Sequence, residues 1–154
     1  MGEFATRKSQ NAFGGTGPGW ARQIIHDVTV VELPTTALQT GDITWLTYIP
    51  AGAVIVDGYV ACDDLDTGAS LAYNIGDSTT TNLFFSTTTT GQSATSSTML
   101  AGARYTKYAA ATRVKATITT TAETAAAGTM IFGLSYFIDP EINVTTGVAP
   151  IVIV

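Results

Sequence analysis

The chain has 154 residues, enough for one domain with a substantial core, and it is 45% hydrophobic but only 12% charged, about half the charged fraction of ordinary soluble domains. Its net charge of −5 argues against a nucleic-acid partner, and one histidine and one cysteine leave little for catalysis or an internal disulfide. No run approaches the roughly 18 apolar residues of a membrane helix, and residues 1–19 lack the apolar stretch of a signal peptide. The composition favours a structural or binding protein, made in the cytoplasm, without membrane or nucleic-acid partners.

Residues 1–20 form a polar, glycine-rich arm in which Gly and Pro recur too often for a helix or a long strand. Aromatic and basic side chains are spaced along it: Phe4, Arg7, Lys8, Phe13 and Trp20. One interpretation is that the arm orders against a partner through these residues. The other is that Trp20 alone packs on its own domain and the rest is disordered, with residues 1–4 a cloning remnant.

From residue 24 onward the pattern predicts short β-strands, because β-branched and aromatic residues recur between turn signals. The first five strands are expected at residues 24–31, 43–49, 54–62, 71–75 and around 83–85. In the third strand, simple alternation places Val54, Val56, Gly58, Val60 and Cys62 on one face. The long polar stretch at residues 86–98 is typical of a functional or disordered loop.

Three more strands are expected at residues 104–108, 112–120 and 130–138. The strand at 112–120 alternates most cleanly, with Val114, Ala116 and Ile118 inward and Arg113, Lys115, Thr117 and Thr119 outward. The strand at 130–138 has an apolar face from Met130 to Ile138, and Ile131 and Phe137 add apolar side chains to the opposite face. Because sandwich strands normally have one solvated face, this pattern predicts a covered outer side, such as a subunit contact.

Eight short strands and no helix longer than a turn or two predict an all-β, single-domain antiparallel β-sandwich, and their regular spacing favours a jelly roll. The sandwich is expected at residues 21–139, between the arm at 1–20 and a C-terminal tail at 140–154. The tail ends in four apolar residues: Ile151, Val152, Ile153 and Val154. Two interpretations stay open for them, a strand added to a neighbouring sheet and a last strand of the same domain.

The sequence offers little chemistry. A nucleophile pair would have to use His26, which lies mid-strand beside Asp27 on the opposite face, so we expect a structural or surface histidine. The acidic loop from Asp63 to Asp66 is the best metal candidate, but it fits a calcium loop only loosely and lacks the distal glutamate of an EF-hand. Cys62 is expected to be a small buried apolar residue. We therefore predict no catalytic, cofactor or metal site, and of the seven basic residues only Arg104, Lys107, Arg113 and Lys115 could form a patch.

Two blocks of the sequence, residues 48–60 and 71–77, resemble the small head-decoration, or capsid cement, proteins of tailed bacteriophages. The shared pattern is a hydrophobic strand, a Pro-x-Gly turn at Pro50–Gly52, a β-branched strand, a polar loop and a strand that ends in Gly76-Asp77. Residues 128–139 resemble the closing strand of that family. The likeness spans roughly residues 24–139, and turn-plus-strand patterns of this kind recur in many β-proteins.

The resemblance implies an oligomeric β-sandwich, often a homotrimer, on the outer surface of a virion at symmetry axes, where it clamps adjacent major capsid proteins after head expansion. It carries no catalytic residue. From composition, we predict that the arm residues named above, Ile131, Phe137 and residues 151–154 contact the capsid or another subunit. The alternative is a jelly-roll module of a phage tail or fibre that binds a glycan or receptor through exposed tyrosines: Tyr48, Tyr59, Tyr105 and Tyr108.

Overall fold

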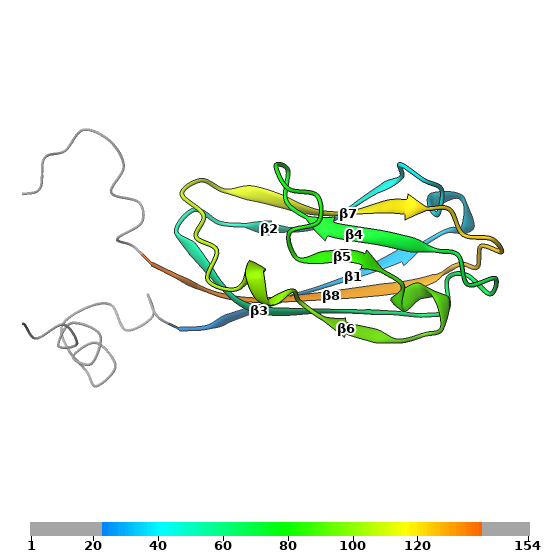
Figure 1. Ribbon diagram of the computed structural model, residues 1–154. Coiled ribbons are helices and arrows are strands. Elements are labelled where there is room, and N and C mark those ends of the chain that lie inside the picture. The colour runs from blue at the N-terminus through cyan, green and yellow to red at the C-terminus, as the bar shows by residue number, and fades with distance from the viewer. Residues whose placement is uncertain (1–22, 140–154) are drawn as a thin grey trace, which may run out of the picture.

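The computed structural model describes residues 23–139, which form two sheets packed face to face (Figure 1). The strands are β1 (Ile25–Leu33), β2 (Ile43–Ile49), β3 (Ala53–Cys62), β4 (Ala72–Gly76), β5 (Phe85–Thr88), β6 (Ser96–Thr98), β7 (Thr112–Thr120) and β8 (Gly128–Ile138). Three short 3-10 turns, η2 (Thr35–Ala37), η3 (Thr90–Gln92) and η4 (Ala101–Ala103), are the helical elements among the described residues. None of the helical segments in residues 23–139 has the length and apolar character needed to cross a membrane.

The strand order identifies the topology. One sheet runs β1-β8-β3-β6 and the other β2-β7-β4-β5, with every pairing antiparallel. The pairs β1–β8, β2–β7, β3–β6 and β4–β5 are those of one long hairpin folded at its middle, and rolling that hairpin produces two four-stranded sheets. This is the jelly-roll arrangement. The predicted antiparallel β-sandwich is therefore confirmed.

The core lies between the sheets and is filled from both inner faces. On β7 the inward residues are Val114, Ala116 and Ile118, as alternation predicts. On β8 the buried side chains include Met130, Phe132 and Leu134, and Phe132 meets Phe85 of the opposite sheet edge to face, with ring centroids 6.4 Å apart. Such aromatic contacts between layers add to the free energy gained by burying apolar area.

A β-bulge corrects the predicted alternation of β3. The register against β8 shifts between Ile55 and Asp57, so that Ile55 joins Gly58, Val60 and Cys62 inside the sandwich. Val56 is only partly buried, contrary to the prediction that it shares the face of Val60. One inserted residue moves the preceding side chains to the other face, because the side-chain period of a strand is two residues.

Two further expectations were wrong. The stretch at 86–98, predicted as a loop from its polarity, contains most of β5, the turn η3 and the whole of β6, since β-branched threonine fits a pleated sheet despite its hydroxyl. The strand predicted at 104–108 is an irregular segment beside β3. It forms the backbone hydrogen bonds Tyr105 N–Ile55 O at 2.7 Å and Tyr108 N–Ala53 O at 2.9 Å. A positive φ of 64° at Tyr105 prevents a continuous strand.

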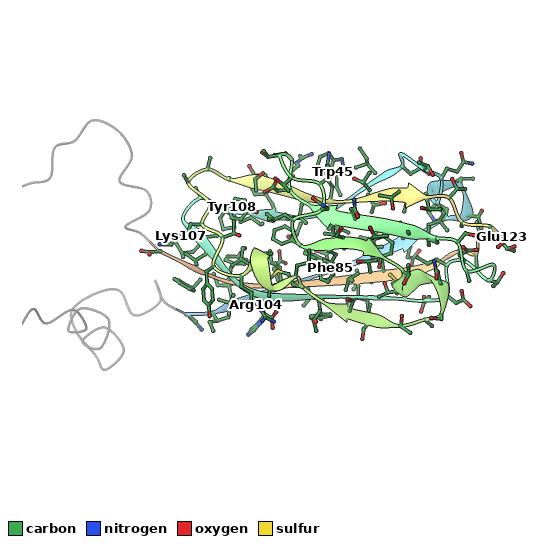
Figure 2. The ribbon with its side chains drawn as sticks, viewed as in Figure 1. Trp45, Phe85, Arg104, Lys107, Tyr108 and Glu123 are labelled. Atoms are coloured by element: carbon green, nitrogen blue, oxygen red, sulfur yellow. The ribbon has the colours of Figure 1, made fainter. Side chains whose placement is uncertain are left out.

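The described chain begins and ends at the same end of the sandwich (Figure 1). Ile25 pairs with Tyr136 there, and the amide of Asp139 donates to the carbonyl of Gly52 at 2.8 Å. The acidic loop and the connection from β7 to β8, which contains Glu123, lie at the opposite end (Figure 2). The two long faces of the sandwich therefore lie between a chain-terminus end and an acidic-loop end.

Candidate docking surfaces

The outer face of the β1-β8-β3-β6 sheet carries a patch of exposed apolar side chains. In register, Val30 lies beside Ile131 and Ile131 beside Ala61, while Val28 lies beside Gly133 and Gly133 beside Tyr59. Val28 is 52% exposed, Val30 is 62% exposed and Tyr59 is 42% exposed. Contiguous exposed apolar surface on a folded domain is typical of a contact site. We call these two rows, together with Phe137 further along β8, the valine face.

Tyr59 lies over the backbone of β8. A Cβ atom placed on Gly133 would come within 2.2 Å of the Tyr59 ring, so the ring occupies the space that a side chain would take. An aromatic ring that covers a strand glycine in this way supplies the packing that glycine lacks. The predicted contact residues Ile131 and Phe137 both point to this outer face and are partly buried. Whether they contact another protein stays a prediction.

One end of the valine face is polar. Ser135 lies between His26 and Asp57 in the register, and its hydroxyl is 2.8 Å from Nδ1 of His26. Asp57 accepts from Arg104 at 3.1 Å. The carboxylate of Asp57 therefore lies on the opposite side of Ser135 from His26, and it is already paired with Arg104. Asp27 points to the opposite face, where it accepts from Thr47, so no acid among residues 23–139 orients the imidazole.

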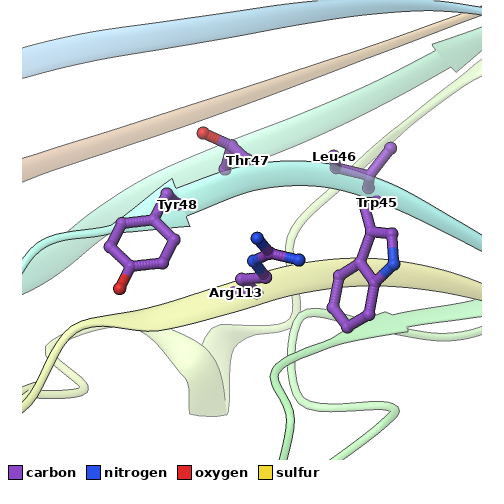
Figure 3. A pocket seen from close by; sticks show the side chains of 5 residues that line it. All are labelled: Trp45, Leu46, Thr47, Tyr48 and Arg113. Carbon is purple, nitrogen blue, oxygen red and sulfur yellow. The ribbon is translucent and has the colours of Figure 1, made fainter.

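The opposite face of the sandwich, on the β2-β7-β4-β5 sheet, carries an aromatic and cationic cluster. A bulge between Trp45 and Thr47 lets Trp45 and Tyr48 emerge on the same side of β2, 50% and 56% exposed. Arg113 of β7 lies between the two rings (Figure 3). A hollow of about 280 Å³ is lined by Trp45, Leu46, Thr47, Tyr48 and Arg113. We call it the Trp45 pocket.

Two cations contact the indole of Trp45. The guanidinium carbon of Arg113 lies 5.3 Å from the ring centroid and the Nζ of Lys115 lies 5.9 Å from it. Both distances are within the range of cation–π attraction. Arg104, by contrast, pairs with Asp57 on the other sheet, on the far side of the molecule from Trp45 (Figure 2). The four basic residues expected to form one patch are therefore divided between faces.

Hydrogen bonds from backbone amides to aspartate carboxylates stabilise the acidic loop. Asp66 is fully buried, and its carboxylate accepts backbone N–H groups from four residues at 2.7–3.0 Å: Gly68, Ser70, Leu71 and Thr124. Burial alone would raise the pKa of Asp66, but these four donors outweigh burial and hold its pKa well below the ordinary range. Asp63 accepts from the amide of Thr129 at 2.8 Å. Within residues 23–139, no cluster of three His, Cys, Asp or Glu side chains has the arrangement of a metal site.

Two buried phenols explain other parts of the sequence. The hydroxyl of Tyr108 donates to Asp77 at 2.9 Å, and Asp77 also accepts from the amides of Thr79 and Thr80. The Gly76-Asp77 pair thus ends β4: a Cβ on Gly76 would lie 2.0 Å from the carbonyl oxygen of Thr80.

Tyr73 contacts Thr90 and the buried thiol of Cys62, and burial raises the pKa of that thiol. Cys62 is therefore the buried residue that the sequence predicts.

The four tyrosines considered for glycan stacking do not form one platform. Tyr108 is buried, Tyr59 lies on the valine face, and Tyr105 is on the segment beside β3. Of the four, Tyr48 lines the Trp45 pocket. The remaining predicted contact residues lie outside the described residues: Phe4, Arg7, Lys8, Phe13, Trp20, Ile151, Val152, Ile153 and Val154.

No protein-family profile matches the chain, and none of the curated proteins matches it. Solved structures of three phage capsids contain chains with a similar fold. A chain in the capsid asymmetric unit of cyanophage Pam1 is 24% identical with a TM-score of 0.72, over 82% of this chain and 93% of that chain. A chain of the capsid of Ralstonia phage GP4 is 23% identical with a TM-score of 0.69, over 85% and 94%. A chain of the acidic stable capsid of Helicobacter pylori bacteriophage KHP30 is 15% identical with a TM-score of 0.54, over 76% and 93%. At these identities the likeness is one of fold.

Proposed function

We propose that this chain is a virion structural protein that decorates the outer surface of an icosahedral phage capsid and bridges neighbouring major capsid proteins. The observation that carries the proposal is the fold match to chains of three phage capsids, each covered over more than nine tenths of its length. In each case the aligned region is a larger share of the matched chain than of this chain, so the matched capsid chains are also small. The decoration role is what the sequence resemblance to cement proteins implies.

Two features of the described residues suit such a role. The sandwich presents the valine face on one sheet and the Trp45 pocket on the other, so a single domain can contact two neighbours at once. Separating those neighbours would re-expose the apolar surface buried against the domain, which opposes separation. Specific interfaces generally bury more than about 1,000 Å². We propose that the arm and tail, together with the valine face, supply that area against the capsid or against other copies in a homotrimer.

We also propose that the chain is not an enzyme. Its histidine contacts Ser135 with no supporting acid from the described part of the chain, and the carboxylates of Asp66 and Asp77 already accept hydrogen bonds from backbone amides. Nothing in the hydrogen-bonding pattern of the described residues holds a carboxylate, imidazole or thiol ready for proton transfer.

The test is reconstitution on heads purified from a phage whose copy of this gene has been deleted. The proposal predicts that the added chain co-sediments with expanded heads to saturation and raises the temperature at which they release DNA. A chain that stays in the supernatant at all concentrations would refute the decoration role. If heads bind the chain without becoming more stable, the result would support the decoration role and contradict the clamping function.

One observation favours a second candidate, a glycan- or receptor-binding module of a tail or fibre. Tyr48 and Trp45 are half exposed beside one hollow, and exposed aromatic rings are where sugar rings stack. Binding to host cell-surface glycans, abolished by Trp45→Ala and independent of heads, would support this function over decoration.

A further inference from the structure

The Trp45 pocket has a charge pattern that the carboxylates of residues 23–139 leave unbalanced. In residues 23–139 the ion pair between Arg104 and Asp57 is on the other sheet, and no carboxylate of the described residues pairs with Arg113 or Lys115. The chain as a whole has a net charge of −5, so two cations side by side on an indole are a local exception. A local positive site on an acidic protein attracts an anionic partner at one place and repels it elsewhere, which fixes how the partner docks.

The geometry suits a bidentate oxyanion, and on an unmodified protein partner that group is a carboxylate. Arg113 lies against the indole of Trp45 with Tyr48 on its other side (Figure 3). A guanidinium held by aromatic neighbours keeps its N–H edge for a bidentate contact, and a carboxylate matches that edge. Lys115 supplies a second charge 5.9 Å from the same ring. The side chains that position Arg113 leave its hydrogen-bonding groups for a ligand.

The lining also separates an acidic peptide from a sugar. The five lining residues include no Asp, Glu, Asn or Gln, and the hydroxyl of Thr47 already donates to Asp27. Sugar hydroxyls are both donors and acceptors, so a sugar site draws on carboxylate or amide acceptors, whereas the side-chain acceptors of this lining are the hydroxyl oxygens of Thr47 and Tyr48. An acidic side chain flanked by an apolar one uses what the pocket offers, a cationic edge beside exposed aromatic surface.

We propose that the Trp45 pocket docks an acidic segment of a neighbouring capsid protein, with one carboxylate held by Arg113 and Lys115 and an apolar neighbour packed on Trp45. The identity of the partner rests on the proposed function. The chemistry of the site does not, so the two can be tested separately.

The first arm of the test uses heads that lack this chain. Arg113→Gln is expected to weaken binding to heads at least about thirtyfold, the threshold for an interface hot spot. Arg113→Lys is expected to lose part of that affinity, because it keeps the charge but not the planar fork. Lys107→Gln removes the same charge from an exposed residue that does not line the pocket, and it should bind as the wild type does. Salt should weaken the wild type more steeply than Arg113→Gln.

The second arm needs no heads. In a Trp20→Phe background Trp45 is the only indole, and poly-L-glutamate should change its emission, whereas the same titration of the Arg113→Gln variant should show no change. Thermal unfolding of each variant checks that the sandwich is intact. Equal affinity of wild type and Arg113→Gln in both arms would overturn the proposal. A response to alginate, a polymer of acidic sugars, at lower concentration than to poly-L-glutamate would also overturn it, because the occupant would then be a glycan.

If wild-type chain fails to bind heads but Trp45 still responds to poly-L-glutamate through Arg113, the carboxylate site stands and the decoration role falls. If heads bind the wild type and Arg113→Gln equally, the decoration role stands and the carboxylate site falls as its docking point.

Discussion

Asp66→Ala tests whether the carboxylate of Asp66 stabilises the folded acidic loop. Its carboxylate accepts four backbone amides from both sides of the loop end, one of them from Thr124 on the connection between β7 and β8. Alanine would leave those amides without their acceptor and would remove one link to that connection, where the amide of Thr67 still donates to the carbonyl of Thr124 at 3.2 Å. We expect the largest loss of stability among substitutions of the carboxylates in the acidic loop.

The magnitude follows from the burial of the donors. A buried amide left without a partner costs about 1–3 kcal/mol, and a hydrogen bond to a charged acceptor contributes about 1.5–3 kcal/mol. The amide of Leu71 is buried, whereas those of Gly68, Ser70 and Thr124 are partly buried and can recover water. We therefore expect Asp66→Ala to lower the free energy of unfolding by about 3–4 kcal/mol, near the top of the range for one substitution.

Urea unfolding followed by circular dichroism measures this loss. Asp64→Ala, which removes an exposed carboxylate two residues away, is the matched control and should change stability by less than about 0.5 kcal/mol. Asp66→Asn keeps one acceptor oxygen and should fall between the two. Equal stability of Asp66→Ala and Asp64→Ala would show that the Asp66 carboxylate does not stabilise the loop. A large rise in melting temperature on adding calcium would show instead that the carboxylate binds a cation.

The same carboxylate predicts a pH dependence. The pKa of Asp66 is lower in the folded chain than its ordinary value of about 4, so the folded state favours the charged form. The stabilisation is fully present above about pH 4 and is lost as the pH falls through the folded pKa. The stability difference between wild type and Asp66→Asn should therefore shrink below pH 4. A difference that stays constant from neutral to acid pH would contradict the assignment.

Three other predictions use matched substitutions. Gly133→Ala should lower the free energy of unfolding by about 1 kcal/mol because its Cβ would displace the Tyr59 ring. Gly102→Ala, with nothing within 4 Å of the added atom, should leave the stability unchanged, and equal effects of the two substitutions would contradict the packing of Tyr59. Tyr108→Phe should lower the free energy of unfolding by about 1–1.5 kcal/mol because it removes the hydrogen bond to Asp77, whereas Tyr105→Phe, at an exposed position, should cause no loss. Burial and Asp77 raise the pKa of Tyr108, so its phenolate should form only when the chain unfolds at alkaline pH. Val28→Asp with Val30→Asp should weaken head binding at least about tenfold while Thr119→Asp, on an exposed position of β7, leaves it unchanged; unaltered binding would remove the valine face from the interface.

Periodicity predicted the elements whose side chains alternate without interruption. β7 and β8 have continuous two-residue patterns, so their inward residues and the apolar outer face of β8 followed from the sequence. The fold class followed from the number of strands. The strand order β1-β8-β3-β6 did not, because its pairings β1–β8 and β3–β8 join segments far apart in sequence, such as Ile55 and Tyr136.

The Trp45 pocket was beyond periodicity for a specific reason. Simple alternation places Trp45 and Tyr48 on opposite faces of β2, and the bulge between Trp45 and Thr47 brings them to the same face. The outward positions of Arg113 and Lys115 were predictable from β7, but their neighbour on β2 was not. Bulges in β2 and β3 therefore account both for the pocket and for the incorrect alternation around Val56.

The most direct test of the central claim is a cryo-electron microscopy comparison of heads with and without this chain. Decoration of the shell by this chain predicts difference density of the size of one small sandwich, repeated over the outside of the shell and spanning the junctions between capsid subunits. Difference density confined to the tail, to the inner surface of the shell or to no site at all would contradict the decoration role.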